Sequence, residues 1–330
     1  MINHFLHQPM SGKPLSLFRA VWGAFLIYYF LDTYWLLEFY FGHNGIQSIE
    51  GLTYTPPVLQ WSLFYWVNDS PIMFPFVFGL ALLSALGLCI GIKTRICSVI
   101  SWICTVSLVT PISWGSNSAD AVVTILSFLF MVCGLAGHTA QYFCLDAAGS
   151  SKVKGDPPLI PAWTYRLFQI QLCAIYFFSG LHKFGIAQWK SGYAISNVLQ
   201  QTDSWMRVDF SALSEYPALI ALITTSVVLF ELILFPVFIW FHRTRLIILG
   251  LGVAYHLTIV LTMRVFIFTE VMIVFYLCFL TTKEVNAIES AVTKALSRLI
   301  NKIKNDPAEN AEEIKVEIDP ANQSGNTSRD

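Results

Sequence analysis

Long apolar runs separated by short polar breaks set the pattern of this chain. A helix needs about 20 mostly apolar residues to cross a bilayer. Such runs recur eight times before residue 283, with turn-forming residues between them. We therefore predict an all-α, polytopic membrane helix bundle of about eight transmembrane helices. Their expected bounds are roughly 16–41, 72–92, 96–113, 121–137, 163–186, 217–241, 246–262 and 265–282.

The distribution of lysine and arginine between the loops predicts the orientation of the bundle. Basic residues fall in the loops at 93–95 and 242–245, whereas the loops at 42–71 and 114–120 contain no Lys or Arg. Loops rich in these residues stay in the cytoplasm. We therefore expect both the N-terminus and the C-terminus to be cytoplasmic.

The segment after the last apolar run has a different pattern. The transmembrane domain is expected to cover 1–282. Between 283 and 305, apolar residues return every three or four positions among basic ones, which predicts a basic amphipathic helix at the inner membrane surface. A helix packed against its own bundle fits the same pattern. The sequence then turns acidic and polar, so 306–330 is predicted to be a disordered tail.

Composition supports the membrane assignment. Hydrophobic residues make up 55% of the chain and charged residues 12%, whereas soluble domains carry about 25% charged residues. This deficit excludes an ordinary soluble enzyme, and the net charge of -1 disfavours a nucleic-acid partner. The seven cysteines include no Cys-x-x-Cys pair, so neither a disulfide framework nor a metal site is expected.

The run at 163–186 carries the most polar side chains. They recur at alternating three- and four-residue spacing, which places them on one face of a helix. Lys183 lies at the outer end of this face under the predicted orientation. The members of the face are Arg166, Gln169, Cys173, Tyr176, Gly180 and Lys183.

Lys183 is the first candidate for chemistry. Burial disfavours a charged amine and lowers its pKa, so a desolvated lysine can act as a general base. The plain alternatives are an ion pair that fixes helix packing and a lysine whose amine reaches the outer interface. The residues of this run alone favour neither the catalytic nor the structural interpretation of Lys183.

Other ionisable residues are expected in the same outer half of the membrane. Asp32, His256, Arg264 and Glu270 all fall there under the predicted orientation. His256 alone fits a packing role, and Arg264 and Glu270 could pair with each other, so the cluster is the stronger signal. Glu231 lies 14 residues after Pro217, which is about 21 Å along a helix. It is therefore expected deeper, away from this cluster.

Several stretches together resemble a known family. Residues 171–184 read QLCAIYFFSGLHKF, and 189–194 read WKSGYA. Over roughly 13–282, the chain resembles the HTTM membrane domain of the vitamin K-dependent gamma-carboxylase family and its bacterial relatives. Shorter matches follow in the family's order at Pro14–Arg19, Phe143–Asp146, Phe230–Leu232 and Tyr255–Leu257.

The resemblance implies an activity for Lys183. In the carboxylase, the matching lysine is the base that activates reduced vitamin K. Oxygenation of this hydroquinone generates a strong base, which removes a proton from the gamma carbon of glutamate before carbon dioxide adds. That site faces the lumen, in agreement with the predicted outer position of Lys183. The resemblance thus implies reduced vitamin K or menaquinol, with CO2 and O2, as cofactors.

The chain also differs from the carboxylase. No large lumenal region that binds a propeptide is expected, and Asn117, Ser118 and Asp120 stand where the carboxylase uses a histidine. The closer resemblance is to standalone bacterial proteins. These include the B membrane component of the sporulation-delaying toxin system, which helps mature a secreted peptide.

The leading hypothesis is therefore quinone-linked modification of a secreted peptide or protein at a bacterial cell membrane. The alternative is a non-enzymatic membrane helper for maturation, export or immunity of such a peptide. A transporter is disfavoured because the sequence shows no internal repeat. The leading hypothesis assigns Lys183, His256, Glu270 and Asp32 to catalysis, and Tyr176, Gly180, Trp189 and Arg264 to cofactor binding.

Overall fold

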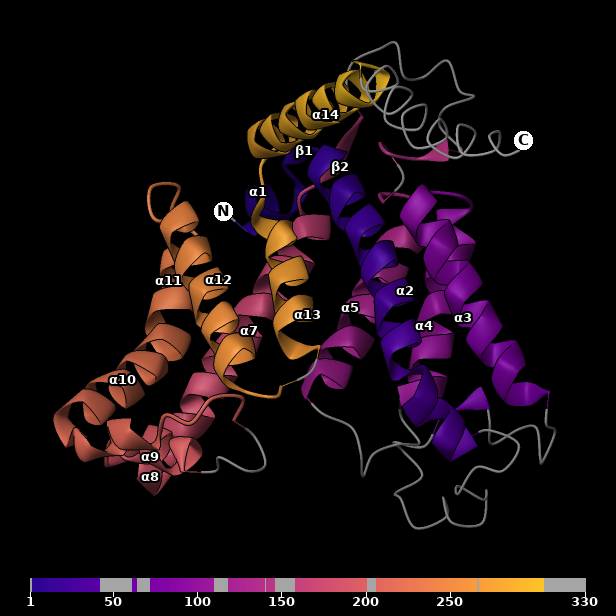
Figure 1. Ribbon diagram of the computed structural model, residues 1–330. Coiled ribbons are helices and arrows are strands. Elements are labelled where there is room, and N and C mark those ends of the chain that lie inside the picture. Colours follow the sequence, from indigo (N-terminus) through magenta and orange to yellow (C-terminus); the bar gives the residue numbers. More distant parts are fainter. Residues whose placement is uncertain are drawn as a thin grey trace, which may run out of the picture. The chain divides into compact units, whose positions relative to one another are not determined.

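The computed structural model describes residues 2–41, 61–63, 72–109, 118–139, 141–145, 158–200, 206–265 and 267–305. Within these ranges the chain is almost entirely helical (Figure 1). It begins with the short helix α1 (Ile2–His7), and the one sheet described pairs β1 (Pro9–Ser11) antiparallel with β2 (Leu159–Pro161). The predicted tail at 306–330 and Asn117 lie outside the described residues.

All eight predicted apolar runs are helical, which confirms the all-α membrane bundle. Where the residues on both sides of a helix end are described, the end lies within a few residues of the expected bound, as is usual for helix boundaries. The helices are α2 (Lys13–Phe41), α3 (Met73–Ile90), α4 (Thr94–Val109), α5 (Ser118–Leu135), α7 (Trp163–Gly185), α10 (Pro217–Leu229) with η7 (Phe230–Leu234) and α11 (Phe235–Phe238), α12 (Arg245–Thr262), and α13 (Phe268–Phe275) with η8 (Tyr276–Phe279).

Fewer than eight of these helices qualify as complete spans on length and hydropathy. In the described part of the chain, five are long and apolar enough to cross a membrane. A sixth qualifies if α13 and η8 form one broken span with the helix that follows them. α4 is described over 16 residues, and α7 carries ionisable side chains on one face. The shortfall from eight therefore reflects a short helix and a polar helix rather than a different fold.

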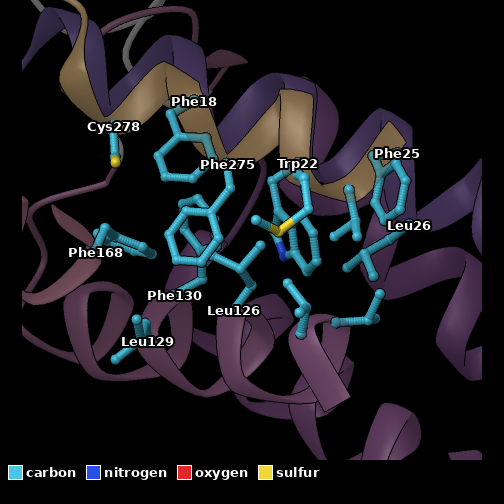
Figure 2. Close-up of a cluster of buried hydrophobic side chains, with 14 of the residues drawn as sticks. Phe18, Trp22, Phe25, Leu26, Leu126, Leu129, Phe130, Phe168, Phe275 and Cys278 are labelled. Atoms are coloured by element: carbon cyan, nitrogen blue, oxygen red, sulfur yellow. The ribbon is translucent and has the colours of Figure 1, made fainter. Parts of the chain in front are cut away.

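An aromatic core joins the first helices to the later ones. Figure 2 shows Phe18 and Trp22 of α2 directed toward Phe130 of α5. The rings of Phe18 and Phe130 lie 4.8 Å apart, and Phe18 also lies 5.1 Å from Phe168 of α7 and 6.4 Å from Phe275 of α13. Aromatic side chains bury large areas and pack edge to face at such spacings. This core therefore holds α5, α7 and α13 around the first long helix.

Large apolar side chains cover the outside of several helices. Leu83 of α3, Leu222 of α10 and Ile247 of α12 are 67%, 64% and 62% exposed. Soluble monomers rarely expose apolar surface on this scale. These faces are those that a lipid bilayer would cover, in agreement with the predicted membrane location.

Short helices connect the ends of α7 and α10. They are α8 (Ala187–Lys190), α9 (Ala194–Leu199) and η6 (Ser211–Glu215), and they pack around a small cluster of Leu199, Met206 and Ile220. Met206 pairs with Met263 in an isolated antiparallel bridge, and the N–H of Arg207 donates to the carbonyl of Thr262 at 2.8 Å. This connection therefore holds the end of α12 beside the segment that follows α7.

Contact density divides the chain into two units, Met1–Leu280 and Thr281–Asp330. The first unit contains all the helices named above. The second contains α14 (Thr282–Asn305), whose exposed apolar side chains recur along one face and whose basic side chains lie on the other. Its location at a membrane surface stays a prediction.

Candidate active site

The polar face of α7 is buried along most of its length. Near its start, Arg166 lies over the ring of Phe5 at 4.3 Å and donates to the side-chain oxygen of Gln169 at 2.7 Å. Gln169 in turn donates to the carbonyl of Cys278 at 2.9 Å. These contacts tie α7 to α1 and η8. The first half of the polar face therefore serves helix packing.

Near the end of α7, Lys183 forms a buried ion pair with Glu231. Its Nζ lies 2.5 Å from Oε2 of Glu231 and donates to the hydroxyl of Ser179 at 2.7 Å. The amine also lies 5.4 Å from the ring centre of Trp189. The other carboxylate oxygen of Glu231 accepts a hydrogen bond from the hydroxyl of Tyr255 at 2.8 Å. The amine is thus held by charge rather than left desolvated and alone.

The expectation that Glu231 lies away from the cluster was wrong. Side chains on a helix point back toward its N-terminus, so the amine of Lys183 reaches inward past Ser179, one turn earlier. Glu231 itself lies in η7, a π-helical turn within the α10–α11 stretch. Pro236 follows two residues after this turn and offers no N–H to the helical ladder. Distance counted along a regular helix therefore misplaced the carboxylate.

Gly180 allows α7 to approach η7 closely enough for this pair to form. A Cβ atom at this position would lie 2.7 Å from the backbone nitrogen of Leu232 and 3.0 Å from the carbonyl carbon of Glu231. Both are backbone atoms, which cannot swing aside as a flexible side chain would. The side of Gly180 that was expected to leave room for a cofactor is therefore occupied by the backbone of η7.

A second network lies next to the ion pair. The hydroxyl of Tyr176 is 2.8 Å from Nε2 of His256 and is also hydrogen-bonded to the hydroxyl of Tyr276. All three residues are at most 5% exposed. The hydroxyl of Thr269 donates to the carbonyl of His256 at 3.0 Å. Nδ1 of His256 is buried and has no hydrogen-bond partner among the described residues.

Both networks open onto one cavity of about 440 Å³. This volume falls within the range typical of small-molecule sites. Lys183, Glu231 and Tyr255 line it from one network, and Tyr176 and His256 line it from the other. The remaining wall is mostly apolar and comes from α5, α7 and α13. Its apolar members include Val122, Ile125, Ile175, Phe268 and Met272.

Four residues predicted from the sequence gather here. Lys183, His256 and Tyr176 line the cavity, and Trp189 lies beside the amine of Lys183. Gly180 lies on the same helix face and contacts η7. The predicted helix face and histidine therefore line one cavity, together with a carboxylate that the prediction did not include.

The other predicted residues lie outside the cavity lining. Asp32 is exposed on α2, and Arg264 is exposed on the connection between α12 and α13. Glu270 is half-buried, and its Oε2 has no hydrogen-bond partner in the described part of the chain. Neither Asp32 nor Glu270 lines the cavity.

Sequence reasoning missed Tyr255, Tyr276 and Ser179. Tyr255 precedes His256 directly, so a tyrosine beside a candidate histidine was an available signal. Ser179 lies four residues before Lys183, where a helix places side chains next to each other. Tyr276 had no such signal, because its hydroxyl reaches Tyr176 only through the packing of η8 on α7.

The arrangement offers proton exchange beside an apolar space. A lysine–glutamate pair can pass a proton along its own hydrogen bond, and Tyr255 and Ser179 hold the two partners in place. The neighbouring imidazole adds a group that can donate or accept a hydrogen bond. Together these groups could bind and deprotonate a weakly acidic hydroxyl carried on an apolar molecule.

Comparison with known proteins identifies one family. The family model described as HTTM domain matches residues 7–283. This match covers most of the chain and includes every residue of the cavity and of both networks. No curated protein and no solved structure matches the chain.

Proposed function

This chain is a multi-pass membrane protein of the HTTM-domain family, and from that premise we propose that it is an enzyme in which Lys183 acts as a general base on a quinol. With O2 and CO2 as co-reactants, as the family resemblance implies, the outcome of this chemistry is modification of a secreted peptide or protein. The resemblance to the vitamin K-dependent gamma-carboxylase family supports the choice of ligand. In that family, the lysine that matches Lys183 activates reduced vitamin K.

The observation that carries the proposal is the Lys183–Glu231 pair in the wall of an apolar cavity. A buried carboxylate and a partly buried amine, 2.5 Å from each other, are costly to remove from water, and such pairs are weak evidence for stability alone. Ionisable residues inside membrane segments are by default candidates for function. A cavity of about 440 Å³ beside the pair gives a ligand access to the amine.

Glu231 supplies the step that a lone lysine would lack. In the ion pair the amine carries the proton, so it cannot act as a base in that form. Transfer of one proton from Nζ to Oε2 of Glu231, across 2.5 Å, leaves a neutral amine and a neutral carboxylic acid. The neutral amine would then be able to accept a proton from the hydroxyl of a quinol bound in the cavity, which leaves Lys183 as a cation beside the anionic oxygen. We therefore assign Glu231 as the proton acceptor for Lys183.

One observation favours the non-enzymatic alternative, a membrane helper for a secreted peptide. Both partners of the ion pair are held by further hydrogen bonds, from Lys183 to Ser179 and from Tyr255 to Glu231. A purely structural lock between α7, η7 and α12 would have the same contacts. Only a test that separates ligand binding from folding can distinguish the two functions.

We expect menaquinol to quench the tryptophan fluorescence of the purified protein saturably. Trp189, 5.4 Å from the amine of Lys183, is the reporter, and Trp189→Phe identifies its share of the signal. Quinol is titrated under anaerobic conditions into wild type and into Lys183→Met/Glu231→Gln, which removes both charges together. We expect the double variant to bind at least about tenfold more weakly, since charge-assisted hydrogen bonds contribute most in such sites.

Lys190→Met provides the matched control. Lys190 lies on α8 close to the site, but it is exposed and does not line the cavity. It should bind quinol as wild type does. Equal quenching of wild type and the double variant would remove Lys183 from the ligand site. No quenching in any of the folded proteins would favour the helper function.

We further propose that α14 lies on an anionic membrane surface. Its exposed apolar residues include Ile288, Val292 and Leu296, and Lys294 and Arg298 lie on the opposite side of the helix. This distribution is typical of helices that lie in the interface plane. A spin label at position 296 should therefore be relaxed more by oxygen than by a water-soluble nickel chelate. A label at position 294 should show the reverse, and equal behaviour of the two would contradict the proposal.

A further inference from the structure

The hydrogen-bond chain that ends at His256 has a direction. Tyr276 of η8, Tyr176 of α7 and His256 of α12 are linked in that order through two hydrogen bonds. Each hydroxyl has a single proton to donate, and a neutral imidazole carries a single proton on one of its two nitrogens. If Tyr176 accepted from both neighbours, its own proton would have no acceptor among the described residues, and Nδ1 of His256 would lack a donor. Two arrangements that run in one direction along the chain remain to be compared.

In the first arrangement, Tyr276 donates to Tyr176 and Tyr176 donates to Nε2 of His256. Every hydroxyl proton then has an acceptor, and the imidazole proton is on Nδ1. In the second, Nε2 donates to Tyr176 and Tyr176 donates to Tyr276. The hydroxyl proton of Tyr276 then has no acceptor among the described residues, and Nδ1 also lacks a donor. Unpaired buried polar groups are costly, so the first arrangement is favoured.

The first arrangement leaves one group unsatisfied, the N–H at Nδ1 of His256. The side chain is 1% exposed and lines the cavity, and Nδ1 has no partner in the part of the chain that the structure describes. Nε2 of the ring is hydrogen-bonded to the hydroxyl of Tyr176, and the backbone carbonyl of His256 accepts a hydrogen bond from the hydroxyl of Thr269. A buried donor of this kind is unusual in native structures and calls for a partner.

We infer that Nδ1–H of His256 donates a hydrogen bond to an oxygen of a small apolar ligand in the cavity, and that Tyr176 positions His256 for this contact. The ligand class is an apolar ring or chain that carries an acceptor oxygen, such as a carbonyl or phenolate. The apolar wall of Ile125, Ile175 and Met272 suits the body of such a molecule. This inference rests on the proposed function in one respect, since it concerns the same cavity.

The tautomer can be measured directly in the protein without ligand. Nitrogen-15 NMR of histidine-labelled protein distinguishes a protonated Nδ1 from a protonated Nε2, and the His256→Gln spectrum assigns the signal. We expect the proton on Nδ1 in wild type. Tyr176→Phe removes the donor to Nε2 and should give a mixture of tautomers. Tyr276→Phe is the matched control, because Tyr176 still donates to Nε2, and it should keep the wild-type tautomer.

Ligand contact is tested with two probes of the same shape. Menadione carries two acceptor oxygens on a methylnaphthalene frame, and 2-methylnaphthalene carries none. We expect His256→Phe to weaken menadione binding by about fivefold to tenfold, as loss of one buried hydrogen bond does. Binding of 2-methylnaphthalene should change less than about twofold, since the apolar wall is intact. Tyr176→Phe provides a second variant, with a smaller loss for menadione alone.

Three results would overturn the inference, and they separate it from the proposed function. A proton on Nε2 in wild type contradicts the direction of the chain, while the role of Lys183 stands. Equal weakening of both probes by His256→Phe shows that the residue only packs, and again leaves Lys183 untouched. Failure of wild type to bind menadione contradicts the ligand class and the quinol function together.

Discussion

Lys183→Met alone is expected to lower the free energy of unfolding by about 3 kcal/mol or more, because it leaves the carboxylate of Glu231 buried without a cation. Glu231 is only 4% exposed, so water solvates its carboxylate poorly once the cation is gone. Unfolding can be followed in lipid bicelles by titration with a denaturing detergent. Glu231→Gln should cost less, since the side chain of Lys183 is 20% exposed and keeps its contact with Trp189.

The double variant Lys183→Met/Glu231→Gln separates charge pairing from function. Replacement of a buried pair by neutral side chains of similar size is often neutral for stability. We therefore expect the double variant to recover stability to within about 1 kcal/mol of wild type, while quinol binding stays lost. Stability losses that simply add, with no recovery in the double variant, would show that the two residues are not coupled in the folded protein.

This cycle also decides between the two functional hypotheses. If the ion pair only fixes the packing of the helices, a stable double variant should retain the cellular activity of wild type. If Lys183 is a base, the same variant should be stable and inactive. A stable double variant with full activity would therefore exclude the catalytic role of Lys183.

Gly180→Ala is expected to destabilise the protein by about 2 kcal/mol, because a Cβ atom at this position meets the backbone of η7. The nearest atoms are the backbone nitrogen and Cα of Leu232, at 2.7 and 2.9 Å. To relieve this contact, α7 and η7 must separate, and separation lengthens the Lys183–Glu231 contact. We therefore expect a loss of quinol binding as well as of stability, measured by the same two assays.

Gly185→Ala is the matched control on the same helix. A Cβ atom there would have nothing within 4 Å, and alanine has a higher helix propensity than glycine. Its stability should equal that of wild type or exceed it by up to about 1 kcal/mol. If Gly180→Ala behaved as Gly185→Ala does, close approach of α7 to η7 would not be needed for the site.

One cavity is lined by two kinds of polar group, the Lys183–Glu231 ion pair and the imidazole of His256. The Lys183–Glu231 pair can take up and pass a proton, whereas His256 can hold an oxygen without changing its own charge. A ligand bound between them would be held at one end and deprotonated at the other. Under the two proposals, the ion pair and Nδ1 of His256, which has no partner among the described residues, therefore have different tasks in the same cavity.

The sequence by itself determined the membrane class, the helical fold and the key helix face. Apolar runs about 20 residues long have few stable alternatives to helices in a bilayer, since every backbone polar group must be satisfied within the segment. The three- and four-residue spacing of polar side chains on α7 is equally local. It therefore identified Tyr176 and Lys183 without any knowledge of their partners. His256 was recognised because an ionisable residue inside an apolar run is costly.

Only the tertiary structure decided which residues face Lys183. The position of Glu231 depends on a π-helical turn, on the direction of the lysine side chain and on close packing at Gly180. Asp32, Arg264 and Glu270 share the predicted depth of Lys183 but lie outside the cavity lining. Depth along a helix is encoded by local sequence, whereas the facing of one helix toward another depends on side-chain packing across the whole bundle.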